Sequence, residues 1–315
     1  MIRVFILVIN QMSEKYSFMT NKINKTNSTA LFLLIFTGFI LNSCNLNPLE
    51  EEQERTLNLV YTDWTESVAL AHLSSVLLEE KMEYDVSMKL ADVKSVYKDL
   101  AEGKADVFPD AWLPETQKKY YDIYQDRIEQ VGIIFPEART GFVVPEYSKL
   151  KTISDLKKYD LPVIGIDSGA GVMHQAVFAL ETHDLQNKVV DYSENVMLQH
   201  LQDSIERRKE IVVTGWKPHW IFARYKVRFL EDPDNLFGAQ EKIYALSRKD
   251  LYEEHPHAVR FFERMQLSEK QLNQLIYEIR INEDPRAGVK EWIKKNEYIV
   301  NQWVKNLKPE RMKIM

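Results

Sequence analysis

The chain has 315 residues, of which 45% are hydrophobic and 28% are charged. These are ordinary values for a globular protein, and at roughly 150 residues per domain the length favours two domains with a sizeable core. They exclude wholesale disorder and a multi-span membrane protein. A formal net charge of -6 at pH 7, without a long basic tract, argues against a nucleic-acid partner. The single cysteine, Cys44, excludes an intramolecular disulfide and a cysteine-rich metal site.

Residues 1–43 have the layout of an export signal. Ala30 to Leu41 (ALFLLIFTGFIL) hold no charge, follow Lys22 and Lys25, and end just before Asn42-Ser43-Cys44. This is the order of charged, apolar and cleavage-site regions in a signal peptide. As a helix, the twelve apolar residues would span only about 18 Å, too short for a ~30 Å hydrocarbon core. The segment is therefore predicted to be removed and not to remain as a membrane span.

Cys44, at the end of the apolar run, is the candidate lipid-attachment residue. Leu41-Asn42-Ser43-Cys44 resembles a bacterial lipobox, in which the cysteine is lipidated and becomes the new N-terminus, although Asn42 and Ser43 replace the commonest residues there. A buried structural thiol is the alternative. The acidic stretch Pro48 to Arg55 favours the lipid anchor, because it predicts a solvated tether over residues 44–56.

Processing at Cys44 would leave 272 residues, and the loss of four basic residues and one acidic residue gives them a net charge of -9. A second apolar stretch, Val4 to Ile9, exceeds what a signal peptide needs. It favours initiation at Met12 or Met19.

From Leu57 on, apolar runs alternate with amphipathic stretches, the rhythm of an α/β protein. Strands are predicted over residues 57–62, 84–90, 105–108, 140–145, 210–216 and 242–247. Helices are predicted over residues 65–81, 92–103 and most of 253–307, and residues 151–171 predict a helix-strand-turn unit. A crossing between domains is expected near Val144, so that residues 57–143 and 242–308 form one lobe and residues 144–241 the other.

Three tryptophans lie in candidate loops at the ends of predicted strands: Trp64 in TDWTES, Trp112 in DAWLP and Trp216 in TGWKPHW. The predicted loops at these strand ends are where an α/β sheet exposes its ligand-facing residues. A single tryptophan is commonly a core residue, but each preceding strand already supplies apolar core side chains. Three aromatic faces around a cavity attract a cation, at roughly 0.5–2 kcal/mol for each desolvated contact. A quaternary ammonium group suits such a cage best, because it cannot donate hydrogen bonds.

The second candidate element is the glycine-bearing turn GIDSGAGVM, residues 165–173, between a predicted strand and a helix. Backbone N–H groups and the helix dipole at such a turn favour an anion such as a carboxylate. The turn lacks the Lys and Ser/Thr of a phosphate-binding loop, and no GxGxxG occurs, so nucleotide binding has little support. Cage and turn together describe a site for a small zwitterion with a permanent cation at one end and a carboxylate at the other.

These blocks and IVVTGWKPHWIFARYKVRFLEDP, residues 211–233, resemble the substrate-binding proteins of glycine betaine/proline betaine ABC transporters, over about residues 57–305. The resemblance implies a two-lobed type II periplasmic-binding-protein fold, of class α/β, with a ligand cleft that closes by a hinge motion. It implies that Trp64, Trp112 and Trp216 surround the trimethylammonium group. The backbone amides of Gly171 and Val172 would hold the carboxylate.

Gln117 lies five residues after Trp112, where some relatives have a histidine that also binds the carboxylate. Glutamine can donate a neutral hydrogen bond but supplies no charge, so the resemblance implies weaker binding or an altered ligand preference. Choline, carnitine or ectoine therefore stay open as ligands, and so does a receptor role in place of transport.

The N-terminal segment and Cys44 predict an exported, lipid-anchored protein, and the resemblance implies a role in osmoprotection, with delivery of the ligand to a permease subunit driven by a separate ATPase. No catalytic residue, cofactor or metal site is expected. An enzyme acting on quaternary amines would need a base or a metal beside the cage. No G-x-S-x-G elbow occurs, which argues against a nucleophilic serine. His255 and His257 flank Pro256 without further ligands, which argues against a metal site. His219 is expected either to line the site or to be a hydrogen-bonded structural residue.

Overall fold

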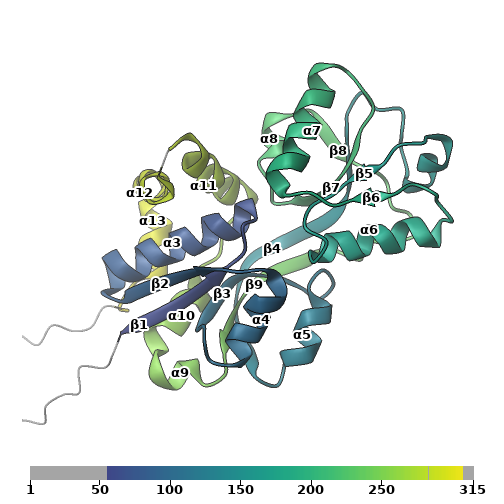
Figure 1. Cartoon of the computed structure of the whole chain (residues 1–315). Coiled ribbons are helices and arrows are strands. Elements are labelled where there is room, and N and C mark those ends of the chain that lie inside the picture. Colours follow the sequence, from purple (N-terminus) through teal and green to yellow (C-terminus); the bar gives the residue numbers. More distant parts are fainter. Residues whose placement is uncertain (1–54, 283, 308–315) are drawn as a thin grey trace, which may run out of the picture. The chain divides into compact units, whose positions relative to one another are not determined.

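The structure is a computed structural model that describes residues 55–282 and 284–307 (Figure 1). The chain divides into two units, Met1–Glu54 and Arg55–Met315, and only the unit Arg55–Met315 is described below. The predicted signal peptide, Cys44 and nearly all of the predicted tether therefore lie outside the described residues. Within the described part of the chain, no helix combines the length and apolarity that a membrane crossing requires.

The first lobe is built on a sheet whose central strand is completely buried. Its strands are β1 (Thr56–Tyr61), β2 (Asp85–Leu90), β3 (Val107–Leu113), β9 (Glu241–Arg248) and the first part of the long β4 (Ile128–Pro145). Strand β1 pairs in parallel with β2 and β3, whereas β9 runs antiparallel between β3 and β4. Every residue of β3 is buried, so this strand is covered on both faces.

The second lobe uses the remaining part of β4. Its other strands are β5 (Val163–Ile164), β6 (Val189–Val190), β7 (Val212–Lys217) and β8 (Val227–Phe229). Along β4 the residues up to Ala138 pair with β9, and those from Arg139 onward pair with β7 and β8. Strand β4 thus joins the two lobes (Figure 1), and the order of the paired strands is β2-β1-β3-β9-β4-β7-β5-β6. The predicted residue limits of the lobes stay predictions.

The helices surround the paired strands, and two of them, α3 and α6, begin at the pocket described below. They are α3 (Thr65–Met82), α4 (Val93–Ala101), α5 (Lys118–Tyr124), the 3-10 helix η2 (Ile153–Lys158), α6 (Gly171–Thr182), α7 (Glu194–Glu206), α8 (Ile221–Arg224), α9 (Leu251–Glu254), α10 (Pro256–Arg264), α11 (Glu269–Ile281), α12 (Pro285–Lys295) and α13 (Glu297–Trp303). Helix α3 packs on β1, β2 and β3 and against α11 and α12 (Figure 1). Its long buried side fixes the position of its first turn, which matters for the site below.

Several predicted elements are confirmed closely. The strand predicted over residues 57–62 and the helix predicted over 65–81 are β1 and α3, each shifted by at most one residue. The helix predicted over 92–103 is α4, with Asp92 accepting a bond from the Ser95 N–H as its N-cap. The C-terminal part is helical, as predicted, from α9 to α13.

The loop predicted at Trp112 is wrong, because Trp112 belongs to β3. The strand predicted over residues 210–216 is confirmed as β7, so Trp216 lies at the end of a strand and not in a loop that follows it. The strand predicted over residues 105–108 continues to Leu113, because both of its faces are buried and polar Asp110 is accommodated inside. The first part of β4 was not predicted. Its pairing with β9 shifts register repeatedly, which breaks the alternation that a regular strand shows.

Candidate functional site

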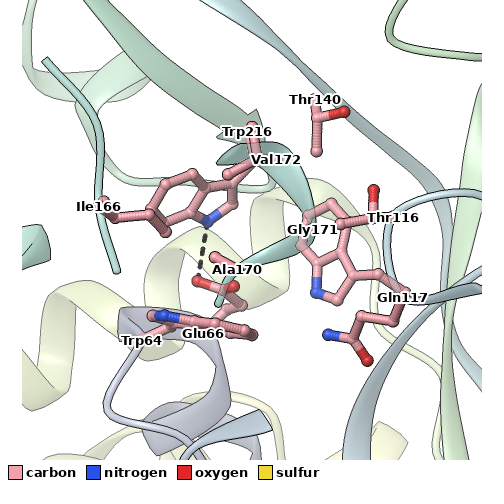
Figure 2. A pocket seen from close by; sticks show the side chains of 11 residues that line it. Trp64, Glu66, Thr116, Gln117, Thr140, Ile166, Ala170, Gly171, Val172 and Trp216 are labelled. Atoms are coloured by element: carbon pink, nitrogen blue, oxygen red, sulfur yellow. Dashed lines mark hydrogen bonds between the residues drawn. The ribbon is translucent and has the colours of Figure 1, made fainter. Parts of the chain in front are cut away.

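All three predicted cage tryptophans line one pocket, which holds about 290 Å³ of empty space, part of it open to solvent. Figure 2 shows this pocket, with Trp64 and Trp216 labelled. The pocket also receives the other predicted ligand residues, Gln117, Gly171 and Val172. Its complete lining is Trp64, Glu66, Trp112, Thr116, Gln117, Thr140, Ile166, Ala170, Gly171, Val172 and Trp216. The structure therefore brings together six residues that lie between positions 64 and 216 of the chain.

Both lobes contribute to this pocket. Trp64 directly precedes α3 and Trp112 lies near the end of β3, so these two come from the first lobe. Trp216 lies near the end of β7, and Gly171 begins α6, so these come from the second lobe. The three indoles are 7%, 3% and 3% exposed, respectively. The pocket is thus a cleft between the lobes with desolvated aromatic walls.

Two buried carboxylates orient the indoles. The Trp216 Nε1–H donates to Glu66 Oε2 at 2.9 Å, a bond that joins the two lobes (Figure 2). The Trp112 Nε1–H donates to Asp110 Oδ1 at 3.0 Å within β3. Each ring is held at its edge, which uses its only hydrogen-bond donor and leaves the π-faces for other contacts.

Glu66 and Asp110 were missed by the sequence analysis. Glu66 is 2% exposed and lines the pocket, and Asp110 is completely buried behind Trp112. Burial raises the pKa of Asp110 to about 8. Burial, with the nearby carboxylates of Asp110 and Glu194, raises the pKa of Glu66 well above its ordinary value. A signal for both existed, because each acid lies two residues from a cage tryptophan.

Gln117 lines the pocket with a side chain that is completely buried. Its Oε1 accepts a hydrogen bond from the Tyr97 hydroxyl at 2.9 Å, which directs the Nε2 end elsewhere. That Nε2 makes only a long contact of 3.5 Å with the Asp110 carbonyl. The side chain therefore keeps an underused donor and no charge in the pocket.

The first turn of α6 supplies backbone donors. Its N-cap residue, Ala170, has no side-chain acceptor, so the turn's N–H groups are not capped by a side chain. Gly171 also allows a close approach between the lobes, since a Cβ there would lie 1.8 Å from the carbonyl oxygen of Thr116. Glycine is required at this position for the pocket to have this shape.

A wider groove adjoins the pocket and shares Trp64 and Ala170 with it. Its walls carry four carboxylates and one ammonium group, and these belong to Asp63, Asp92, Asp167, Asp191 and Lys94. Burial and the charge of Asp167 raise the pKa of Asp63. An entrance with this excess of negative charge attracts cations toward the aromatic pocket.

The histidines singled out from the sequence lie outside the pocket lining. His219 is 1% exposed and is hydrogen-bonded to Glu194 and to the Ile221 N–H. His255 is buried at the start of α10. In residues 55–282 and 284–307, no group of three or more potential metal ligands comes together.

Comparison with known proteins assigns the family. Residues 55–295 match the substrate-binding domain of ABC-type glycine betaine transport systems. The chain belongs to this family. The glycine betaine/carnitine transport binding protein GbuC of Listeria monocytogenes serotype 1/2a (strain 10403S) is 31% identical over 174 residues. That alignment covers 54% of this chain and 57% of GbuC, so the chain spans little more than half of this relative.

Solved structures of the betaine-binding family have the same fold. Lactococcal OpuAC, in a closed-liganded conformation complexed with glycine betaine, is 31% identical and has a TM-score of 0.77, over 80% of this chain and 100% of that one. The glycine/betaine/L-proline-binding protein ProX of Borrelia burgdorferi is also 31% identical, with a TM-score of 0.75 over 80% and 97% of the two chains. The predicted family and the predicted type II periplasmic-binding fold are confirmed.

The buried Asp110 makes the free energy of unfolding depend on pH. Its pKa is about 8 in the folded protein and near 3.8 in an unfolded chain, so the folded state retains a proton that the unfolded state releases. The resulting stabilisation is complete below about pH 4 and is lost as the pH rises through 8. Asp110→Asn keeps an acceptor for the Trp112 N–H but cannot ionise. As the pH rises from 6.5 to 8.5, we expect its free energy of unfolding to decrease less than that of the wild type.

Urea unfolding at several pH values measures this difference, and Asp203→Asn, an exposed carboxylate on α7, is the control. Histidine titrations are shared by all three proteins and cancel in the comparison. Parallel curves for the wild type and Asp110→Asn would show that Asp110 is ionised in the folded protein at neutral pH.

Proposed function

We propose that this protein is the extracytoplasmic ligand-capturing component of an ABC importer and that its ligand is glycine betaine or a closely similar quaternary-ammonium zwitterion. One observation carries the proposal. Three indoles from both lobes line a single pocket that also receives the first turn of α6. Aromatic faces and a helix N-terminus are complementary to opposite ends of such a molecule.

The cationic end is assigned to the cage of Trp64, Trp112 and Trp216. A trimethylammonium group has no donor to lose when it leaves water, so the π-faces can surround it at a small desolvation cost. The Glu66 carboxylate lies in the same wall and adds a negative charge when it is ionised. A bound cation would favour that ionised form and lower the pKa of Glu66.

The carboxylate end is assigned to the backbone amides of Gly171 and Val172. They belong to the first turn of a twelve-residue helix, where the macrodipole is positive. The Nε2 donor of Gln117 is the neutral group that can add to this site. The relatives agree with this ligand class, since lactococcal OpuAC was crystallised with glycine betaine and GbuC is named for glycine betaine and carnitine.

Choline is the second candidate, and the electrostatics of the pocket favour it. Choline is a cation without a carboxylate, so it does not need the charge that Gln117 fails to supply. The carboxylate of Glu66 in the wall and the acidic entrance with Asp63, Asp167 and Asp191 both favour a net positive ligand. Relative affinity for glycine betaine and choline decides between the two.

The proposal gives the protein no catalytic role, because the named relatives are transport binding proteins. Its partners would be a permease subunit and a separate ATPase. Anchoring at Cys44 belongs to the proposal on the strength of the apolar run and lipobox-like residues that precede it. A receptor role for the same fold stays an alternative to transport.

Lipid attachment makes the location of the protein depend on Cys44. We expect the wild type to sediment with membranes after expression in a bacterial host, and Cys44→Ser to appear in the soluble fraction. Washing with high salt separates lipid anchoring from electrostatic adsorption. If Cys44→Ser stays in the salt-washed membranes, the protein is held there by something other than a lipid on this residue.

Removing one cage wall tests the ligand class. Isothermal titration of residues 44–315 with glycine betaine, proline betaine, carnitine, ectoine and choline should show saturable binding, with a change in tryptophan fluorescence. Trp216→Ala should weaken binding by about 1–3 kcal/mol, or about 5- to 150-fold, from lost cation-π contact and lost enclosure. Tyr298→Ala, which removes an aromatic side chain that is 81% exposed, is the control. Unchanged affinity in Trp216→Ala would remove this residue from the cage.

Replacing Gln117 separates a zwitterion from a simple cation. We expect Gln117→His to tighten glycine betaine binding, because a protonated imidazole can pair with the ligand carboxylate. The gain should be larger at pH 6 than at pH 8, and choline should show no gain. An equal change for both ligands would mean that residue 117 does not meet the carboxylate.

A further inference from the structure

Glu194 connects the two lobes outside the pocket lining. It is the first residue of α7, in the second lobe, and is 6% exposed. Its Oε2 accepts a hydrogen bond from the Thr65 backbone N–H at 2.9 Å, and its Oε1 accepts one from the Thr65 hydroxyl. Thr65 is the first residue of α3, in the first lobe. A carboxylate of one lobe therefore caps a helix of the other.

Helix α3 has no cap of its own. Its N-cap residue, Trp64, offers no side-chain acceptor, and the helix is 18 residues long. The Thr65 N–H, between buried Trp64 and buried Glu66, has the Glu194 carboxylate as its acceptor. An ionised carboxylate at this position also lies at the positive end of the macrodipole.

His219 holds the carboxylate from its own side. The Ile221 N–H donates to His219 Nδ1 at 3.2 Å, so the ring proton of the neutral imidazole is on Nε2, which donates to Glu194 Oε1 at 3.1 Å. Burial alone would raise the pKa of Glu194, but its bonds to His219 and Thr65 lower that pKa below the ordinary value. With Thr65 and His219 both bound to it, Glu194 is an anion held from both lobes.

The same turn of α3 carries a cage residue and a second bond to the other lobe. Trp64, Thr65 and Glu66 are consecutive, and Trp64 and Glu66 line the pocket while Thr65 meets Glu194. Glu66 accepts the indole N–H of Trp216. Separation of the lobes would break the bonds of Thr65 and Glu66 together. Closure and assembly of the cage therefore involve one helical turn.

We propose that Glu194 is a positioning residue for ligand capture, a latch that holds the first turn of α3 against the second lobe and so keeps Trp64 in the cage. The identity of the ligand rests on the proposed function, whereas the contact between Glu194 and Thr65 does not. Glu194 does not touch the pocket. Its effect is on how long the closed state lasts and not on the contacts of the bound molecule.

The latch predicts a kinetic signature. In stopped-flow measurements of tryptophan fluorescence, Thr65→Val, which removes the hydroxyl but retains the shape of the side chain, should raise the dissociation rate of glycine betaine about tenfold and change the association rate less than twofold. Glu194→Ala should do the same or more, and Thr65→Ser should stay within twofold of the wild type. Asp203→Ala, on the exposed side of α7, is the matched control.

A double-mutant cycle identifies the pair. If Thr65 and Glu194 act through each other, Thr65→Val combined with Glu194→Ala should raise the dissociation rate no further than Glu194→Ala alone. Additive effects, or unchanged dissociation rates in folded single variants, would overturn the latch. Circular dichroism and thermal melting show which variants are folded, and Thr65→Val remains informative if Glu194→Ala does not fold.

Single-molecule energy transfer separates the latch from the ligand assignment. Cys44, the only native cysteine, is first replaced by Ser. Lys104→Cys in the first lobe and Lys158→Cys in the second then carry the two dyes. A wild type that binds none of the tested compounds overturns the proposed ligand. The latch then stands if Thr65→Val lowers the ligand-free closed population at least threefold, and it fails if the distributions of wild type and variant coincide.

Discussion

An indole that leaves water must still satisfy its N–H, and this requirement organises the site. Trp216 meets it with Glu66 and Trp112 with Asp110, so two aromatic walls depend on two buried acids. These two hydrogen bonds require that two carboxyl groups leave water, and this desolvation raises the pKa values of both acids. The Trp112 bond lies within β3 and fixes that ring independently of the other lobe, whereas the Trp216 bond fixes its ring only when the lobes are together.

The same bonds place charge where a cation would bind. In the ligand-free pocket, Glu66 retains its proton more readily than an exposed glutamate, because burial and neighbouring carboxylates disfavour its anion. A quaternary ammonium group in the cage reverses that balance and gains from the ionised form. Gln117, in contrast, brings no charge to the pocket. In the proposed binding mode, the ionisable groups of the pocket therefore act on the cationic end of the ligand.

Much of this could be predicted from the sequence, for physical reasons. The alternation of apolar and amphipathic stretches predicted β1, α3 and α4, and the aromatic blocks pointed to the three tryptophans, while the family resemblance added Gln117, Gly171 and Val172. For Glu66 and Asp110 the only signal was a spacing of two residues from a cage tryptophan, and it is weak, since a carboxylate at such a position is usually solvated. The first part of β4 could not be recognised, because its register shifts erase the alternation of side chains.

Thr65 and Glu194 are separated by 129 positions, and no local pattern relates them. Each has an ordinary local explanation, as the first residue of its own helix. Only the packing of α3 on the first lobe and of His219 in the second brings the hydroxyl, the N–H and the carboxylate together. Because Trp64 directly precedes Thr65, a change in this lobe contact also acts on a wall of the pocket. Ligand affinity in this fold can therefore be altered by residues that never meet the ligand.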